Sequence, residues 1–358
     1  MEQTLSSKAL HERYDWLDQA RGLVVLLLLV SMPTAEYAGD FLTGDPFLGP
    51  PMLNHGYEYF DGYPQVITFI DVGQALFLFV LGFVGYVALT SRWRKRGGRS
   101  AFWYAARRVG ILYALSFVDA ILLQYLSSDT PHWDDFIYNG TFALIAIGSF
   151  AAFLSIAICH DADRRFAIAI GLIMLHALIY EFPIFDERGT FDNVLGLPRF
   201  PFGALGLASM AIAGTCFGQW HRLDADDPLV GFRKRIVPVS TAAFIAAYCV
   251  DWIQPAQHHA ANAALQLIAL YMGGFMLMIF FAFGQVGFRF PLLTSLGRNL
   301  LLIFAVGGLF NSIYLSLIPK TFLMQSPYLA LLLGGIVPVA LFAWFAVFLD
   351  KRGIMVRA

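Results

Sequence analysis

Charged side chains are scarce in this chain of 358 residues: Asp, Glu, Lys and Arg make up 14% of it, against about 25% in an average soluble domain. Hydrophobic residues account for 58%, and the mean hydropathy is +0.64. A water-facing surface could not carry this composition without very large exposed apolar patches. The composition therefore excludes a soluble monomer and indicates that lipid is the solvent for most of the chain.

Cysteine is also scarce, with three residues in the chain. The three cysteines, Cys159, Cys216 and Cys249, lie far apart and lack metal-ligand spacing, which argues against a disulfide framework and against a zinc site. No internal repeat and no Rossmann or P-loop signature is present. We therefore expect no metal cofactor and no nucleic-acid partner.

Long apolar runs bounded by charges or by Pro and Gly predict about ten membrane-spanning helices. The fold class expected is all-α, a polytopic transmembrane bundle that forms a single domain over residues 1–358. A cleaved signal peptide is the alternative for the first run, but the three acids before it are unlike a basic leader. The predicted spans are 22–38, 67–90, 109–127, 138–159, 166–182, 203–219, 236–253, 263–284, 299–318 and 328–349.

Basic residues set the predicted orientation, because Lys and Arg near the ends of spans resist translocation. With the N-terminus in the cytoplasm, 21 of the 24 Lys and Arg lie on the cytoplasmic side. This split favours an even number of spans, with both termini cytoplasmic; eight or twelve spans would keep the same parity. Acidic residues sort the other way, which leaves the outer segments near −11 and the inner ones near +11. The protein is expected in a bacterial inner membrane, where the basic face suits an anionic cytosolic ligand or lipid headgroups.

The outer segment between the first two spans is unusually long, from Gly39 to Val66, and long ordered loops tend to be functional. Its interleaved acidic and aromatic residues can stack on a sugar and hydrogen-bond to it; an interfacial aromatic belt with solvated charges is the alternative. His55 could act as a general base near neutral pH, or it is an exposed loop histidine. The candidate substrate-binding residues are Asn54, Glu58, Asp61 and Tyr63.

Asp71 is expected a few residues inside the second span, where an ionisable group is costly unless it is paired or lines a cavity. It could support His55 or form a structural ion pair. On the inner side, Arg107 and Arg108 offer charge to phosphates, although most such basic runs are topology signals and lipid anchors. Arg298 and Asn299 open the predicted ninth span, and a helix N-terminus with an arginine is a ready anion site.

Four motifs together resemble the heparan-alpha-glucosaminide N-acetyltransferase-like family of multi-span membrane acyltransferases, and the resemblance covers most of the chain in order and spacing. The first two are the apolar run after Leu17-Asp18-Gln19-Ala20-Arg21-Gly22, and Thr68-Phe69-Ile70-Asp71 continuing to Phe77-Leu78-Phe79-Val80-Leu81-Gly82. The other two are Arg107-Arg108 and Leu296-Gly297-Arg298-Asn299-Leu300-Leu301.

The resemblance implies acetyl-CoA as a cytosolic acyl donor, an acceptor at the outer face, and a catalytic histidine before the second-span aspartate, which carries over to His55. The chain departs from the pattern at two points. The family's histidine lies about ten residues before the aspartate, where this chain has Asp61, and an asparagine near the end of the first span aligns with Met32.

The leading hypothesis is an acyl-CoA-dependent transferase that acylates an amine or hydroxyl of a sugar-containing acceptor. His55 would be the base, supported by Asp71, and the four inner residues Arg107, Arg108, Arg298 and Asn299 would hold the CoA. The alternative is a non-catalytic family member that serves as a subunit of a membrane complex, or a transporter for a polar solute. The partners expected are the lipid bilayer, a glycan acceptor, and either a second copy of the chain or other membrane subunits.

Overall fold

In the residues that the computed structural model describes, the secondary structure is helical apart from one pair of two-residue strands. The structure describes residues 15–30, 67, 71–127, 141–180, 190–191, 200–201, 203–224, 227–257, 261–317, 332–333 and 336–355. The described chain divides into two compact units. Unit 1 draws on Met1–Gly56, Thr68–Gly73 and Met276–Ala358, and unit 2 on Tyr57–Ile67 and Gln74–Phe275.

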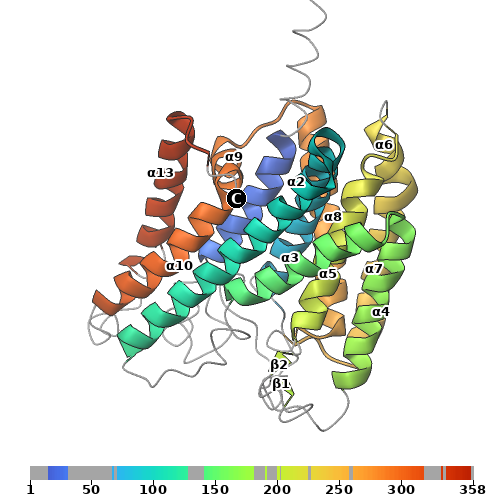
Figure 1. Ribbon diagram of the computed structural model, residues 1–358, viewed down its shortest axis with the longest axis horizontal. Coiled ribbons are helices and arrows are strands. Elements are labelled where there is room, and N and C mark those ends of the chain that lie inside the picture. The colour runs from blue at the N-terminus through green and yellow to red at the C-terminus, as the bar shows by residue number, and fades with distance from the viewer. Residues whose placement is uncertain are drawn as a thin grey trace, which may run out of the picture. The chain divides into compact units, whose positions relative to one another are not determined.

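The long helix α2 (Gly73–Ser127) supplies the first two arms of unit 2 (Figure 1). Gly97 interrupts it with a φ of 80° and a ψ of 170°, a backbone conformation that residues with a Cβ rarely adopt. The first arm therefore ends at Arg96, and a second arm starts again at Gly98. The kink lies inside the basic segment between the second and third predicted spans, which is helical on both sides of Gly97.

Helix α5 (Gly203–Trp220) is the packing centre of unit 2, where it contacts both α3 (Thr141–Ile158) and α4 (Ala162–Tyr180). It also crosses the first arm of α2 at close range. A Cβ at Gly214 would collide with the carbonyl oxygen of Phe79, and one at Gly82 would collide with that of Ala211. Small residues thus let the two backbones touch, as is common between membrane helices.

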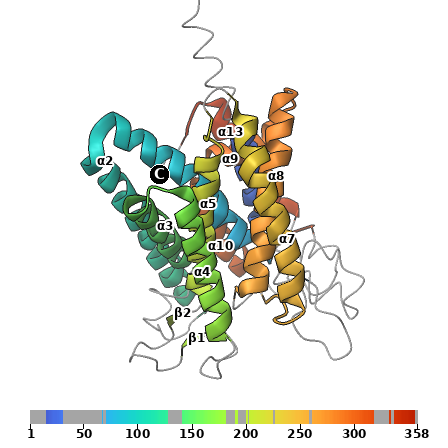
Figure 2. The same cartoon turned by 90° about the vertical axis from the view of Figure 1, so that its right-hand side faces the viewer.

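The rest of unit 2 begins with the short helix α6 (Pro228–Gly231), capped by the Asp227 side chain, which accepts a hydrogen bond from the Leu229 N–H. The π-turn η3 (Phe232–Ile236) then leads into α7 (Val237–Asp251). Helix α8 (Ala263–Gln285) follows and lies beside α7 (Figure 2). The strands β1 (Thr190–Phe191) and β2 (Phe200–Pro201) pair antiparallel, with Thr190 opposite Pro201.

Unit 1 contains the helix over residues 15–30, the end of α8, and the helices α9 (Pro291–Arg298), α10 (Leu300–Leu317) and α13 (Val337–Lys351). Helix α9 packs on both α13 and α10. It also meets the helix over 15–30 at close range, because a Cβ at Gly22 would collide with the Leu293 carbonyl oxygen and one at Gly297 with that of Asp18.

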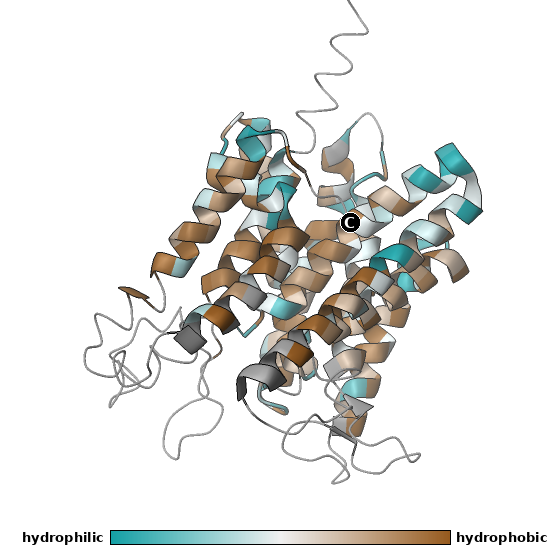
Figure 3. Ribbon diagram, turned by 60° about the vertical axis from the view of Figure 1, so that its left-hand side comes forward, coloured by the Kyte–Doolittle hydropathy of each residue, from teal (hydrophilic) through white to brown (hydrophobic). Residues whose placement is uncertain are grey.

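Each of the ten predicted spans overlaps a helix of the described residues, and the second and third fall on the two arms of α2. The predicted second span starts at residue 67, but α2 begins at Gly73, so Asp71 precedes the helix and does not lie inside it. The prediction of an all-α fold is confirmed. Three of the described helices, within α2, α3 and α8, are long and apolar enough to cross a membrane. Hydropathy follows the same division, since the helix shafts are mostly hydrophobic and hydrophilic positions gather near the helix ends (Figure 3).

Candidate functional site

The outer-loop residues predicted to act on the acceptor, Asn54, His55, Glu58, Asp61 and Tyr63, lie outside the described residues, as does Met32. Their roles stay predictions. Asp71, their proposed partner, is described. It lies in the turn two residues before α2 begins and is only 1% exposed. The positive end of a helix dipole favours an anion, and Asp71 lies next to that end of α2.

Among the predicted CoA-binding residues, Arg108 has the geometry that best suits binding of an anion. It lies on the second arm of α2 and is 8% exposed. Its Nη1 donates a hydrogen bond to the Tyr104 hydroxyl at 3.2 Å. Its Nε is buried and has no hydrogen-bond partner among the described residues. A buried guanidinium N–H is costly without an acceptor, so Arg108 has a donor that can bind a further acceptor group.

A second arginine meets the same tyrosine. The Arg92 guanidinium, from the first arm of α2, lies 4.5 Å from the centre of the Tyr104 ring, within the range of a cation–π contact. The kink at Gly97 therefore brings two cations from opposite arms to one aromatic side chain. Tyr104 itself packs on a buried cluster that includes Leu89 and Phe153, which holds the hydroxyl in place. Arg107, by contrast, is exposed.

These arginines belong to a strongly basic end of unit 2, which we call the cationic end and define as residues 92–108, 159–165 and 219–235. Contacts hold its three segments together: the Trp93 and His160 rings lie 6.4 Å apart, and the Gln219 amide donates to the His160 carbonyl. Its described residues include 13 Lys and Arg against four Asp. Such an excess produces a positive potential that attracts polyanions.

Arg165 anchors the cationic end from inside, since its side chain is fully buried. The guanidinium donates to the Cys159 carbonyl at 2.7 Å, to Gln219 Oε1 at 2.6 Å and to Thr215 Oγ1 at 3.2 Å. It also lies 5.3 Å from the centre of the Tyr86 ring. Because each nitrogen has a neutral acceptor, Arg165 ties α4 to α5 and holds its charge beneath the surface.

The other two predicted CoA-binding residues, Arg298 and Asn299, belong to unit 1. Arg298 ends α9 and is ringed by three carboxylates, with nitrogen–oxygen distances of 3.1 Å to Asp15, 3.8 Å to Asp18 and 2.9 Å to Asp350. Burial alone would lower the pKa of Arg298, but the hydrogen bonds and charges of Asp350 and Asp15 raise it. A phosphate would have to approach through this acidic ring, so the geometry favours a structural role.

The ring around Arg298 connects distant parts of the sequence. Asp350 also accepts a hydrogen bond from Ser295, and Asn299 donates to the carbonyl of Ile354. Asp18 pairs with Arg21 at 2.9 Å, yet burial raises the pKa of its carboxyl above the usual value. The motif that begins at Leu17 and the motif that begins at Leu296 therefore meet in unit 1, through this network and the close approach of Gly22 and Gly297.

Fold and site together define a helical protein with apolar helices of membrane-spanning length and a strongly cationic end. No protein-family model matches the chain, and no curated protein matches it at a significant level. The resemblance described above therefore stays a prediction that depends on the four motifs.

Sequence reasoning did not single out four residues that shape these sites: Tyr104, Arg165, Gln219 and Asp350. An arginine directly before an apolar run is an ordinary topology signal, so nothing in the sequence separates the buried Arg165 from the exposed Arg164. Tyr104 is the exception, because its spacing of four from Arg108 places both on one face of a helix.

Proposed function

We propose that the protein is an integral-membrane acyltransferase of about ten spans, with both termini cytoplasmic. It would transfer an acetyl group from cytosolic acetyl-CoA to an amine or hydroxyl of a sugar-containing acceptor at the outer face. The reaction class comes from the sequence resemblance. The single structural observation that supports it is the buried Arg108 Nε, which lacks an acceptor among the described residues. Arg108 and Arg92 both contact Tyr104, so two guanidinium groups lie around this side chain.

The phosphates of CoA are the acceptors that would complete this site. Guanidinium groups bind phosphate oxygens through short, charge-assisted hydrogen bonds. The 13 basic residues of the cationic end raise the local concentration of a polyanion. In this proposal Arg92, Arg107 and Arg108 hold the donor, and Arg298 and Asn299 stabilise unit 1 instead. The base remains His55, with Asp71 supporting it, and the helix bundle keeps water from the thioester.

The test is binding of acetyl-CoA to the purified full-length protein, measured by calorimetry. We expect Arg108→Gln to weaken binding by about tenfold or more, since a hydrogen bond to a charged group contributes about 1.5–3 kcal/mol. Arg164→Gln is the matched control, because it removes the same charge from an exposed position at the same end; we expect less than a threefold effect there.

Catalysis is tested separately with labelled acetyl-CoA and an amino-sugar acceptor. His55→Ala should abolish transfer and leave acetyl-CoA binding intact. A wild-type protein that binds no acetyl-CoA would overturn the proposal, and stable co-purification with other membrane subunits would then favour the non-catalytic alternative. Full activity of His55→Ala would overturn the choice of base.

A further inference from the structure

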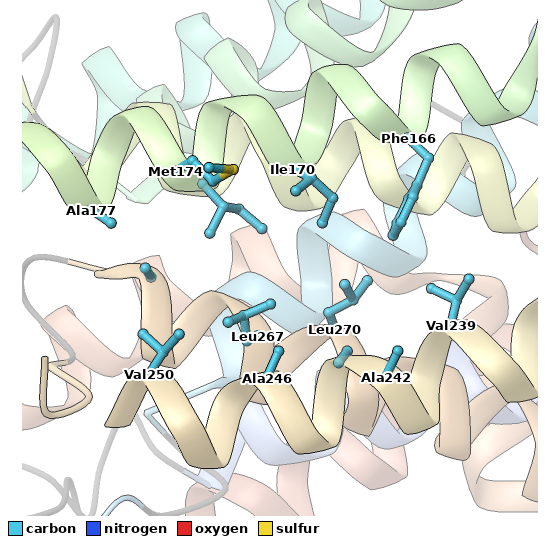
Figure 4. Close-up of a pocket in the computed structure, with 13 residues that line it drawn as sticks. Phe166, Ile170, Met174, Ala177, Val239, Ala242, Ala246, Val250, Leu267 and Leu270 are labelled. Atoms are coloured by element: carbon cyan, nitrogen blue, oxygen red, sulfur yellow. The ribbon is translucent and has the colours of Figure 1, made fainter. Parts of the chain in front are cut away.

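Helices α4, α7 and α8 line an apolar groove of about 340 Å³ in unit 2 (Figure 4). Among the described residues, no charged side chain lines it. Its walls include Phe166, Ile170 and Ala177 from α4, Val239 and Val250 from α7, and Leu267 from α8. The groove is open to the surface of the protein, because Met174 lines it and is 64% exposed.

The length of the groove matches one leaflet of a bilayer. Its lining runs from Phe166 to Ala177 along α4 and from Val239 to Val250 along α7. At about 1.5 Å per residue each stretch is about 16 Å long, which is half of a hydrocarbon core about 30 Å thick. Phe166 and Val239 lie at one end, and Ala177 and Val250 at the other (Figure 4). The groove is thus shaped for a single acyl chain lying parallel to the helices.

An ion pair lies at the end marked by Phe166 and Val239. Asp163, three residues before Phe166, accepts a hydrogen bond from Arg235, four residues before Val239, at 2.7 Å. The Asp163 side chain is 50% exposed and that of Arg235 is 47% exposed, so both can also reach a ligand. The Trp220 indole N–H donates to the other carboxylate oxygen of Asp163 at 2.9 Å, which fixes the orientation of the carboxylate.

We propose that this groove binds a phospholipid with a primary-amine headgroup, such as phosphatidylethanolamine, from the inner leaflet. One acyl chain lies between α4 and α7, the Arg235 guanidinium binds the phosphate, and the Asp163 carboxylate binds the ammonium. The opposite charges of the pair match the opposite charges of the headgroup. The inference rests on the proposed membrane placement but not on acyl transfer.

The headgroup, rather than the chain, gives the selectivity. An acyl chain gains little by leaving other lipid chains for the groove, because lipid tails are as apolar as the residues that line it. A phosphate can bind Arg235 whatever group it carries, whereas only an amine can donate to Asp163. Replacing the amine by the glycerol of phosphatidylglycerol removes a charge-assisted hydrogen bond, which lowers the affinity by about tenfold.

The test uses the purified full-length protein in detergent, incubated with equal amounts of phosphatidylethanolamine and phosphatidylglycerol, with bound lipid counted by native mass spectrometry. The wild type should retain phosphatidylethanolamine about tenfold over phosphatidylglycerol. Asp163→Asn should bring the ratio near one, and Ala246→Phe, which fills the groove, should reduce retention of both lipids. Asp227→Asn removes the same charge from an exposed cap that Asn can also serve, so its ratio should equal that of the wild type.

Equal retention of the two lipids by the wild type, or an unchanged ratio in Asp163→Asn, would overturn the inference. Each variant is first checked for an unchanged melting temperature and a monodisperse gel-filtration peak. If Asp163→Asn misfolds, the wild type is tested with phosphatidylcholine in place of phosphatidylglycerol. The methylated amine of phosphatidylcholine cannot donate a hydrogen bond to Asp163, so the wild type should retain this lipid poorly as well. Acetyl-CoA binding on the same samples separates the two proposals: its loss with lipid selectivity intact overturns only the acyltransferase, and the reverse overturns only the lipid site.

Discussion

At the scale of single residues, Arg165 and Arg298 show two ways in which a protein stabilises a guanidinium group. Arg298 is surrounded by three carboxylates and keeps a side chain that is 30% exposed. Arg165 is fully buried and is held by neutral oxygens and by the Tyr86 ring. A buried charge is costly unless every donor is satisfied, so the second arrangement depends on three acceptors lying in fixed positions. Arg165 therefore acts as a lock between α4 and α5.

Arg165→Ala should lower the free energy of unfolding by about 2–4 kcal/mol, because it leaves a cavity and strands buried acceptors on Thr215 and Gln219. The check is the melting temperature of the detergent-purified protein. Arg164→Ala, the exposed neighbour on the same helix, should change stability by no more than about 0.5 kcal/mol. Equal effects of the two substitutions would show that Arg165 is not a lock.

At the scale of elements, helix packing in unit 2 depends on glycines that let backbones touch. Gly214 of α5 faces the Phe79 carbonyl and the Phe83 amide of α2, and Gly218 comes next on the same face. A side chain at Gly214 would meet backbone, which cannot rotate away as a side chain could. The two helices would have to separate.

Gly214→Ala should therefore destabilise the protein by about 1–3 kcal/mol, the usual cost of overpacking. Gly110 and Gly171 provide the controls, since each is helical and a Cβ there meets nothing within 4 Å. Gly110→Ala and Gly171→Ala should be neutral or should stabilise by up to about 1 kcal/mol, because alanine is the better helix former. Thermal unfolding of the three variants side by side decides between packing and propensity, and a Gly214→Ala protein as stable as these controls would rule out the close crossing.

Helices could be predicted from the sequence more readily than loops. Apolar runs located the helical segments, because a helix that crosses a hydrocarbon core about 30 Å thick needs about 20 consecutive apolar residues. Residues 92–108 were expected as a basic connection, yet they are helical on both sides of Gly97. Arg, Lys and Ala are good helix formers, and the charge that marks a cytoplasmic segment does not prevent a helix. The pairing of Arg92 with Tyr104 depends on the angle of the kink, which no spacing rule supplies.

At the scale of the whole molecule, charge is scarce and segregated. In unit 2 the cationic end contains 13 Lys and Arg, while all the described residues that line the groove between α4, α7 and α8 are apolar. The proposed donor site and the proposed lipid site both lie where the cationic end borders apolar helices. The basic segments of the cationic end could be found by counting residues in the sequence. Which arginines already bind other protein groups could not, because that depends on the contacts of Arg165, Arg235 and Arg298 in the fold.

The proposed orientation makes a prediction about the whole molecule that labelling can check. With the three native cysteines replaced, single cysteines at Lys95 and Lys351 should react with a membrane-impermeant maleimide only after the cells are permeabilised. A cysteine at Asp186, in a segment predicted to lie outside, should react in intact cells. An even number of spans requires Lys95 and Lys351 to behave alike, because both then lie on the basic side. Labelling of Lys351→Cys but not Lys95→Cys in intact cells would instead require an odd number of membrane crossings between the two positions. The C-terminus would then lie outside, and only the cytoplasmic position of the cationic end would be retained from the proposed orientation.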